Sequence, residues 1–423
     1  MSRRWMTLAV LMVALAISLP AWATNGDNLI GVGPISRAMG GVGVAAPQDA
    51  ISAVFLNPAA MCFGSYCPGS EVNFAGTAFM PKVKASVSNS QGTFTAEGKE
   101  NVYPIPAIGL SVPITKDPNK FRFGLAAYGV SGLGVDYRGT SLDQNAFSPP
   151  FPAPGSPLIA GEYTNLQIMK FAPAVGWQIN PKWSVGLAVH IDYANLDLRG
   201  GSSPGYAFGF QPGVIWHPSD NWSLGLNYVS AQSVDHQNVI PAAFGGGDLT
   251  LEAPQQATFG AAYTFLSGRF LVEADAKWVN WANAKGYSDF DWKDQWVFGI
   301  GGQYQVIEKL FLRLGYNFGT NPVEEHNGWN GTFGADSVNV QGTNFPRYYY
   351  ETFRIIGFPA IVEQHFTAGI GYQFTESFRL DLGFMYAPEN TITETGTDLL
   401  GAPATIESSL SEIGVDFGLT WRF

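Results

Sequence analysis

The residues best suited to bind a ligand are a few basic side chains that stand between apolar neighbours. Lys170 lies between a methionine and a phenylalanine, and Lys277 and Arg313 occupy similar positions further along the chain. An unpaired cation in an apolar cavity is costly, and the carboxylate of a ligand can supply the missing partner. We therefore name Lys170, Lys277, Arg313 and, nearer the N-terminus, Arg37 as candidate ligand-binding residues.

The same residues have a second interpretation, in which the charges pair with one another and fix the interior. Other charged or titratable residues share the faces on which the candidates lie: His190, Asp192, Glu273, Asp275, Arg379 and Asp381. Glu273, Asp275 and Lys277 are spaced for pairing among themselves. The sequence leaves both interpretations open.

No catalytic motif accompanies these charges. The chain has 5 histidines, no Gly-x-Ser-x-Gly sequence and no pair of histidines at metal-ligand spacing. We predict that the protein is not an enzyme and that it uses no cofactor and no metal. An esterase or acyltransferase is an alternative that would need a serine or histidine cluster at the rim of the fold.

Two cysteines, Cys62 and Cys67, lie close together with a glycine between them. In an oxidising compartment we expect them to form a disulfide rather than remain as free thiols. A metal site would need further ligands nearby, and the sequence around them offers none.

The elements that must position the candidate residues are β-strands. The chain ends in Ile413–Phe423, where every second residue is apolar or aromatic and the residues between them are polar or small. This period of two describes a strand with one apolar face. Such a terminal strand is typical of a transmembrane barrel, whose strands are paired on both sides and show apolar residues to lipid.

Alternating segments recur along the chain, and we predict an all-β fold, a 14-stranded antiparallel transmembrane β-barrel. The strands are expected at roughly 70–90, 102–114, 121–132, 162–179, 183–198, 205–217, 221–231, 251–265, 269–280, 294–305, 309–319, 363–374, 377–387 and 411–423. Tight turns alternate with long connections at 133–161, 232–250, 320–362 and 388–410, as in outer-membrane barrels. A β-sandwich, the alternative for repeated short strands, would not need these features together.

The chain divides into three parts. Residues 1–23 have a basic start, a short apolar run and a small-residue cleavage site, which indicates a secretory signal. Residues 24–69 are rich in glycine and alanine and do not alternate, so we expect them to form a hatch that plugs the lumen of the barrel, residues 70–423.

Composition excludes two other classes of protein. The formal charge of −11 argues against a nucleic-acid partner. No run of about 18 apolar residues follows the signal, so a helical membrane protein is not expected.

Three short motifs in the hatch segment point to a known family. They are Ser36–Ala45 with Arg37-Ala38 and its glycines, Pro47–Ala50, and Asn57-Pro58-Ala59. In this order they resemble the N-terminal hatch of the FadL family of outer-membrane transporters for long-chain fatty acids and aromatic hydrocarbons. Pro104-x-Pro106 is also similar to the family. Family members often carry an acidic-Asp-Arg cluster before the twelfth strand, whereas Phe358–His365 here lacks the arginine, which leaves a hydrocarbon transporter or a divergent member open.

The resemblance implies passive uptake of hydrophobic cargo, which binds inside the barrel and leaves sideways into lipid at an inward kink of the third strand. Four glycines lie close together in that strand, and we place the lateral opening at Gly129 to Gly132. The apolar, proline-rich loop 133–161 carries Phe147 and Phe151, which we name as candidates for capturing cargo at the outer surface. The alternative for the glycines is close packing of the hatch.

The expected partners are therefore hydrophobic small molecules and outer-membrane lipid, and the protein is expected to be a monomer. The cargo is not specified further by the sequence: a fatty acid, an alkane or a monoaromatic compound would suit it equally. The main alternative function is a general diffusion porin for small polar solutes, which should have a charged constriction and no hatch. A purely structural or adhesive barrel is a third candidate.

Overall fold

The computed structural model describes residues 25–61, 70–99, 102–117, 120–143, 161–199, 201–240 and 247–423. The predicted signal segment 1–23, the cysteines Cys62 and Cys67, and Phe147 and Phe151 lie outside the described residues. The predictions made for them therefore stay predictions.

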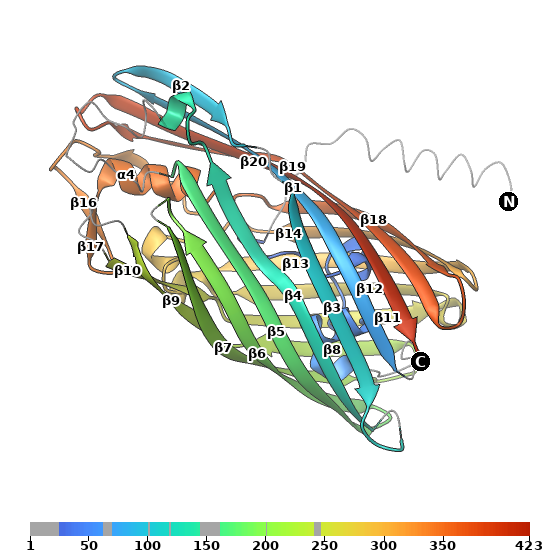
Figure 1. The fold of residues 1–423 in the computed structure, drawn as a ribbon. Coiled ribbons are helices and arrows are strands. Elements are labelled where there is room, and N and C mark those ends of the chain that lie inside the picture. The colour runs from blue at the N-terminus through green and yellow to red at the C-terminus, as the bar shows by residue number, and fades with distance from the viewer. Residues whose placement is uncertain are drawn as a thin grey trace, which may run out of the picture.

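The described strands form a closed antiparallel barrel of 14 strands, as predicted (Figure 1). The barrel strands, in chain order, are β1 (Glu71–Asn89), β3 (Tyr103–Pro113), β4 (Phe121–Asp136), β5 (Tyr163–Asn180), β6 (Trp183–Asp197), β7 (Ser202–Trp216), β8 (Trp222–Val229), β11 (Gln256–Phe265), β12 (Phe270–Val279), β13 (Gln295–Ile307), β14 (Leu310–Gly319), β18 (Gln364–Gln373), β19 (Phe378–Thr397) and β20 (Pro403–Arg422). The first and last strands pair from Glu71↔Arg422 to Ser88↔Thr405, which closes the barrel.

Two of the predicted long loops are largely strand. Segment 388–410 was expected to be a loop, but β19 and β20 pair as far as Thr397↔Pro403. Segment 232–250 was also expected to be a loop, and it contains the hairpin of β9 (Gln232–Ile240) and β10 (Gly247–Ala253). In the β19 and β20 extensions the outward residues, such as Glu407, are polar, and Ile392, Ala404, Ile406 and Leu410 are buried, so the lipid-facing pattern that revealed the other strands is missing.

The outer face of the barrel is apolar and carries aromatic pairs at the end with the short turns. Trp183 stacks on Trp216 with ring centroids 5.5 Å apart, and Phe121 stacks on Trp177 at 5.6 Å. Bands of Trp, Tyr and Phe are favoured where a membrane protein meets the interface between lipid and water. None of the helices in the described ranges is long and apolar enough to cross a membrane.

Residues 25–61 lie inside the barrel, seen as the blue segment enclosed by the wall in Figure 1. They form α2 (Pro34–Ala38), α3 (Ala50–Leu56) and η1 (Pro58–Ala60). Hydrogen bonds join this hatch to opposite sides of the wall: Gly40 N to Thr367 Oγ1 at 2.9 Å, and Ser184 Oγ to Ala59 O at 2.7 Å. The non-alternating segment therefore fills the lumen.

The connection between β14 and β18, residues 320–362, folds over the outer end of the barrel, and we call it the cap. It contains β15 (Asn327–Trp329), β16 (Ser337–Val340), β17 (Thr343–Pro346), α4 (Arg347–Thr352) and the π-helical turn η7 (Phe353–Gly357). The connection between β12 and β13 adds η5 (Trp281–Asn283) and η6 (Ser288–Phe290) below it. Buried aromatic side chains from the two connections pack together, as in Phe290 against Phe353 with centroids 5.1 Å apart.

Candidate functional site in the barrel lumen

A cavity lies between the hatch and the wall of the barrel, and we call it the lumen cavity. Its non-atom space is about 810 Å³, a figure that includes open solvent. Its lining is Asp27, Asn28, Leu29, Val44, Phe55, Leu56, Tyr128, Val130, Ile168, Lys170, His190, Asp192, Asn227, Val229, Gln232, Ala253, Pro254, Gln256, Thr258, Lys277 and Tyr287.

One side of the lumen cavity is apolar. The hatch contributes Leu29, Phe55 and Leu56, and the wall contributes Tyr128 and Val130 from β4. Phe55 and Tyr128 meet edge to face with ring centroids 5.3 Å apart. Burying apolar surface of a ligand here is favourable by roughly 25 cal/mol for each Å² removed from water.

Another part of the lining is polar, and there the charges of Lys170 and Asp192 pair with each other. Lys170 Nζ lies 2.7 Å from Asp192 Oδ2 and also donates to Gln232. His190 Nε2 lies 2.8 Å from Gln211 Oε1. Lys170 lines the cavity as the sequence indicated, but its charge is balanced by the protein itself.

Lys277 is different from the other candidate cations. It is half-buried at the edge of the lumen cavity, and within the described ranges its ammonium group makes no hydrogen bond and no ion pair. Asp275 attracts Lys277 electrostatically, as the second interpretation expected, but the two groups form no direct ion pair, and both Glu273 and Asp275 accept backbone N–H groups of hatch residues 43–46. Lys277 therefore has donors to offer to a ligand.

Arg37 and Arg313 lie in the packed contact between the hatch and the barrel. Arg37 Nε is 2.9 Å from Asp416 Oδ1, and Arg313 Nη1 is 2.8 Å from Asp381 Oδ1. Arg379 shares Asp381 at 2.7 Å. The Arg37 pair joins the hatch to β20, whereas the pairs at Asp381 lie within the wall, and neither Arg37 nor Arg313 lines the lumen cavity.

The Asn57-Pro58-Ala59 motif also anchors the hatch. The Asn57 side chain accepts from Ala59 N and donates to Val44 O at 2.8 Å and to Val214 O at 3.2 Å. The motif approaches β6 so closely that a Cβ on Gly186 would lie 2.3 Å from Ala59 N. Its role in this structure is to hold the plug against the wall.

The wall beside the lumen cavity is interrupted between β3 and β4, and we call this interruption the seam. The two strands pair only from Ala107↔Tyr128 to Pro113↔Arg122. Beyond Tyr128, β4 has a register shift between Gly129 and Ser131 in its pairing with β5. The carbonyl of Val130, the extra residue in this bulge, accepts a hydrogen bond from Leu29 N of the hatch at 3.2 Å.

The residues that border the seam suit an unpaired edge. Tyr103–Pro106 of β3 pair with β1 but not with β4, and this stretch contains Pro104 and Pro106. Proline has no N–H, so it leaves fewer unsatisfied donors where a ladder ends. A Cβ on Gly132 would meet nothing within 4 Å, whereas one on Gly129 would lie 2.7 Å from Ile105 Cγ2.

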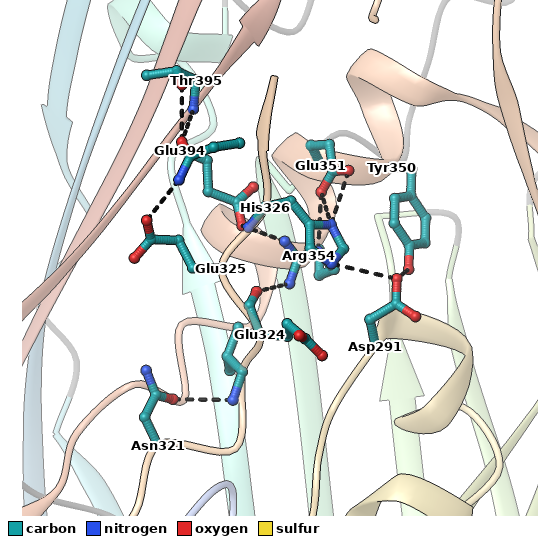
Figure 2. A network of polar contacts seen from close by, with 12 residues as sticks. Asp291, Asn321, Glu324, Glu325, His326, Tyr350, Glu351, Arg354, Glu394 and Thr395 are labelled. Carbon is teal, nitrogen blue, oxygen red and sulfur yellow. Dashed lines mark hydrogen bonds and ion pairs between the residues drawn. The ribbon is translucent and has the colours of Figure 1, made fainter. Parts of the chain in front are cut away.

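The cap is joined to the barrel by a network of ion pairs, which we call the clasp (Figure 2). Arg354 lies at its centre: its Nε is 3.0 Å from Glu351 Oε2, and it also binds Glu394 of β19. His326 Nδ1 lies 3.1 Å from Glu351 Oε1, and Arg347 pairs with the same carboxylate at 2.5 Å. The clasp thus connects the cap to the extended part of β19.

The clasp brings ligand atoms of His326, Glu351 and Glu394 within 4.8 Å of one another, but it does not suit a metal ion. Two arginines already occupy the carboxylates and supply the positive charge that a cation would bring. Burial raises the pKa of Glu394 to about 7, against the opposing charge of Arg354. Burial also acts to raise the pKa of Glu351, but the bond from His326 and the charge of Arg354 outweigh it, so that this pKa is lowered.

Sequence reasoning missed several of these features. Leu29 and Val130 contact each other only because the hatch folds back to β4, and nothing local in either segment signals it. Pro104 and Pro106 were noted for family resemblance, although two prolines in an apolar strand also signal an unpaired edge. The clasp joins three distant segments and has no sequence signal.

Comparison with known proteins agrees with this architecture. The sequence matches a family model described as outer membrane protein transport protein (OMPP1/FadL/TodX) over residues 16–205 and 201–328. No curated protein sequence matches the chain.

Solved structures share the fold at low sequence identity. The Pseudomonas putida toluene transporter TodX has a TM-score of 0.63 and 18% identity, with 93% of this chain and 99% of that chain covered. A Pseudomonas aeruginosa FadL homologue has a TM-score of 0.66 and 16% identity, with coverage of 94% and 100%. The Ralstonia pickettii toluene transporter TbuX has a TM-score of 0.59 and 16% identity, with coverage of 93% and 98%. The plugged 14-stranded barrel and the matched family together show that this chain belongs to the OMPP1/FadL/TodX family of outer-membrane transport proteins.

Proposed function

We propose that this protein takes up hydrophobic small molecules by passive diffusion, binding them in the lumen cavity and releasing them sideways into the outer membrane through the seam. The observation that carries the proposal is that Val130 belongs both to the lining of the cavity and to the bulge at the seam. A ligand in the cavity therefore lies beside the interrupted part of the wall.

A route from outside also supports uptake. A small apolar pocket under the cap is lined by Leu251, Phe290, Trp292 and Phe358, and it shares Tyr287 with the lumen cavity. The hydroxyl of Tyr287 donates to Asp27 of the hatch at this junction. Cargo would pass from one apolar pocket to the next without crossing bulk water.

Lateral release suits apolar cargo for a physical reason. Each methylene that moves from a protein cavity into water costs about 0.8 kcal/mol, whereas lipid accepts it at no such cost. A water-filled porin, the alternative, would need an open lumen, and here the hatch is bonded to the wall on several sides.

We further propose that the preferred cargo carries a carboxylate, as a long-chain fatty acid does. Lys277 is the candidate cation that forms no hydrogen bond and no direct ion pair within the described ranges, and it borders an otherwise apolar and hydrogen-bonded cavity. A charged hydrogen bond from Lys277 to a carboxylate adds binding energy that a neutral hydrocarbon cannot gain.

Substitution at Gly132 tests the exit. Gly132→Arg should abolish most uptake of a labelled long-chain fatty acid and of labelled toluene, because a long charged side chain would lie in the open space beside the seam. Gly132→Ala should leave uptake close to that of wild type. Asn195→Arg is a matched control on the closed wall, since Gly132, Gln167 and Asn195 are consecutive partners across β4, β5 and β6.

Surface expression and heat-modifiable gel mobility show whether each variant is folded. Normal uptake by a folded Gly132→Arg protein would mean that cargo does not leave through the seam. Equal losses in Gly132→Arg and Asn195→Arg would mean that the effect is not specific to the seam.

A further inference from the structure

A second cavity opens at the end of the barrel with the short turns, and we call it the lower cavity. Its non-atom space is about 1080 Å³, including open solvent. Exposed turn residues, among them Pro181, Lys182 and Asp220, border it on the solvent side. Ala45, Ala46 and Pro47 of the hatch form its inner boundary.

Only a thin part of the hatch separates the lower cavity from the lumen cavity. Val44 lines the lumen cavity, and the next residue, Ala45, lines the lower cavity. The wall strand β12 also passes from one cavity to the other. On one of its faces, Lys277 lines the lumen cavity and Leu271 lines the lower cavity. Between them on that face lie Glu273 and Asp275. We call Gly43–Ala46 the strap.

The strap is held to the wall by these two carboxylates. Gly43 N and Val44 N donate to Asp275 Oδ2 at 3.1 and 3.3 Å. Ala45 N and Ala46 N donate to Glu273 Oε1 at 2.6 and 3.3 Å. Within the described ranges neither carboxylate forms an ion pair, so the contact depends on backbone donors that a displaced strap would release together.

The facing wall is shaped for the strap. A Cβ on Gly225 would lie 2.3 Å from Val44 O, and one on Gly260 would lie 3.0 Å from Val44 Cβ. On the carbonyl side, Ser223 Oγ donates to Ala45 O at 2.6 Å. Two glycines and one hydroxyl thus let the strap lie directly on β8 and β11.

We propose that the strap is a gate, and that its release from Glu273 and Asp275 joins the two cavities into a direct passage for small amphipathic carboxylates, such as benzoate. This inference rests on the proposed binding of cargo in the lumen cavity and adds a second exit. Lys277 lies at the upper side of the strap and offers a partner to the carboxylate. The lower cavity ends in solvent at exposed polar turns, so a solute that is stable in water gains this route and a hydrocarbon does not.

The test measures benzoate entry into proteoliposomes that contain the full chain. In a Cys62→Ser, Cys67→Ser background, Ala45→Cys with Ser223→Cys places two thiols where the strap meets β8. Oxidation should lower benzoate entry to the level of empty vesicles, and reductant should restore it. Entry that is unchanged in the oxidised, cross-linked protein would overturn the proposal.

A double variant that removes both carboxylates should have the opposite effect on benzoate entry. Glu273→Ala with Asp275→Ala should raise benzoate entry about tenfold or more, since four strap donors lose their acceptors at once. The thiol lock added to this double variant should abolish the increase when oxidised. An increase that persists in the locked double variant would show that the leak lies elsewhere, and no increase in a folded double variant would show that the carboxylates do not hold a gate.

Gly132→Arg distinguishes exit through the seam from exit through the gate. It should leave benzoate entry unchanged while it blocks hydrocarbon uptake. If Gly132→Arg fails to block hydrocarbon uptake but the lock still controls benzoate, the seam is not the exit and the gate stands. If the lock has no effect but Gly132→Arg blocks hydrocarbon uptake, the gate is wrong and the seam stands.

Discussion

Two neighbouring parts of the wall differ in the continuity of their strand pairing. The β6–β7 ladder is continuous from Trp183↔Trp216 to Asp197↔Ser202. The β3–β4 ladder stops at Tyr128, and β4 then shifts its register against β5. Both parts lie in the same barrel and present apolar residues to lipid.

Composition alone does not explain the difference. β7 contains Pro204 and Pro212 with several glycines; it pairs with β6 along its whole length but with β8 only from Gly213 to Trp216. β3 contains Pro104 and Pro106, and its neighbour on that side is a strand with a bulge. Proline and glycine therefore lie beside an incomplete ladder in both strands, and we infer that the bulge at Val130 distinguishes the β3–β4 edge, because a bulge bends its strand away from a partner.

Removing the bulge at Val130 should have the largest effect, because it should abolish the difference between the two ladders. Deleting Val130 should let β4 continue in one register and pair further along β3, and uptake of hydrophobic cargo should fall by about tenfold or more. Uptake of labelled toluene by cells, normalised to surface expression, measures this. Deleting one residue from the β6–β7 region at Ala194 is the matched control for strand shortening. Retained uptake in a folded Val130-deleted protein would contradict the proposed role of the bulge.

Inside the lumen cavity, Lys277 and Lys170 differ in the same way, because Lys170 forms an ion pair with Asp192 and Lys277 forms none within the described residues. Lys277→Met should weaken binding of a long-chain fatty acid by about tenfold, because a charged hydrogen bond contributes roughly 1.5–3 kcal/mol and part of it is lost to solvent. Toluene binding should be unchanged. Lys170→Met, which also strands Asp192, should lower the stability of the barrel instead.

Fluorescence displacement in detergent, with both ligands on both variants, measures the affinities. Equal weakening for fatty acid and toluene in Lys277→Met would show that the lysine shapes the cavity rather than binding a carboxylate.

The clasp allows a similar test at the outer end of the barrel. Its effect on the stability of the closed cap should be smaller and should depend on pH. The pKa of Glu394 is raised to about 7 from 4.5, so its contribution to cap closure is complete below 4.5 and is lost as the pH rises through 7. The lowered pKa of Glu351 acts in the opposite direction and is lost only as the pH falls below 4.5. Cap protection should therefore fall between pH 5 and 7 by about threefold per unit, less than the tenfold limit of one whole proton.

Hydrogen exchange of residues 347–357, corrected for the intrinsic effect of pH, measures cap protection. Glu394→Gln should remove the dependence in this range. A dependence that survives in Glu394→Gln would assign the titration to another group.

The barrel could be predicted from sequence because lipid imposes a period of two on every membrane-spanning strand. The alternation that ends in Phe423 is direct evidence of that constraint. The extensions of β19 and β20 were missed because they lie beyond the apolar band, where the outward residues are polar. The glycines at 129–132 marked the segment that holds the register shift, but where the ladder to β3 ends depends on pairing between strands.

The candidate site was less predictable because partners came from distant segments. Inward-facing charges followed from alternation, but their pairs depend on register: Lys170 meets Asp192 across β5 and β6, and Arg37 meets Asp416 from the far end of the chain. Glu273 and Asp275 bind backbone donors of the hatch, which have no side-chain signature. Lys277 was named from the sequence, but that it forms no hydrogen bond and no direct ion pair within the described residues could be recognised only from the structure.

Photo-crosslinking of cargo tests the central claim most directly. A long-chain fatty acid with a diazirine on its chain would be added to cells that express the wild-type protein, irradiated during uptake, and mapped by mass spectrometry. Exit through the seam predicts labels on Tyr103–Pro106 and on 129–135, in addition to the lumen cavity, with none on the outward residues of β6 and β7. Labels confined to the lumen and to the lower cavity around Ala45–Pro47, with the borders of the seam unlabelled, would contradict it.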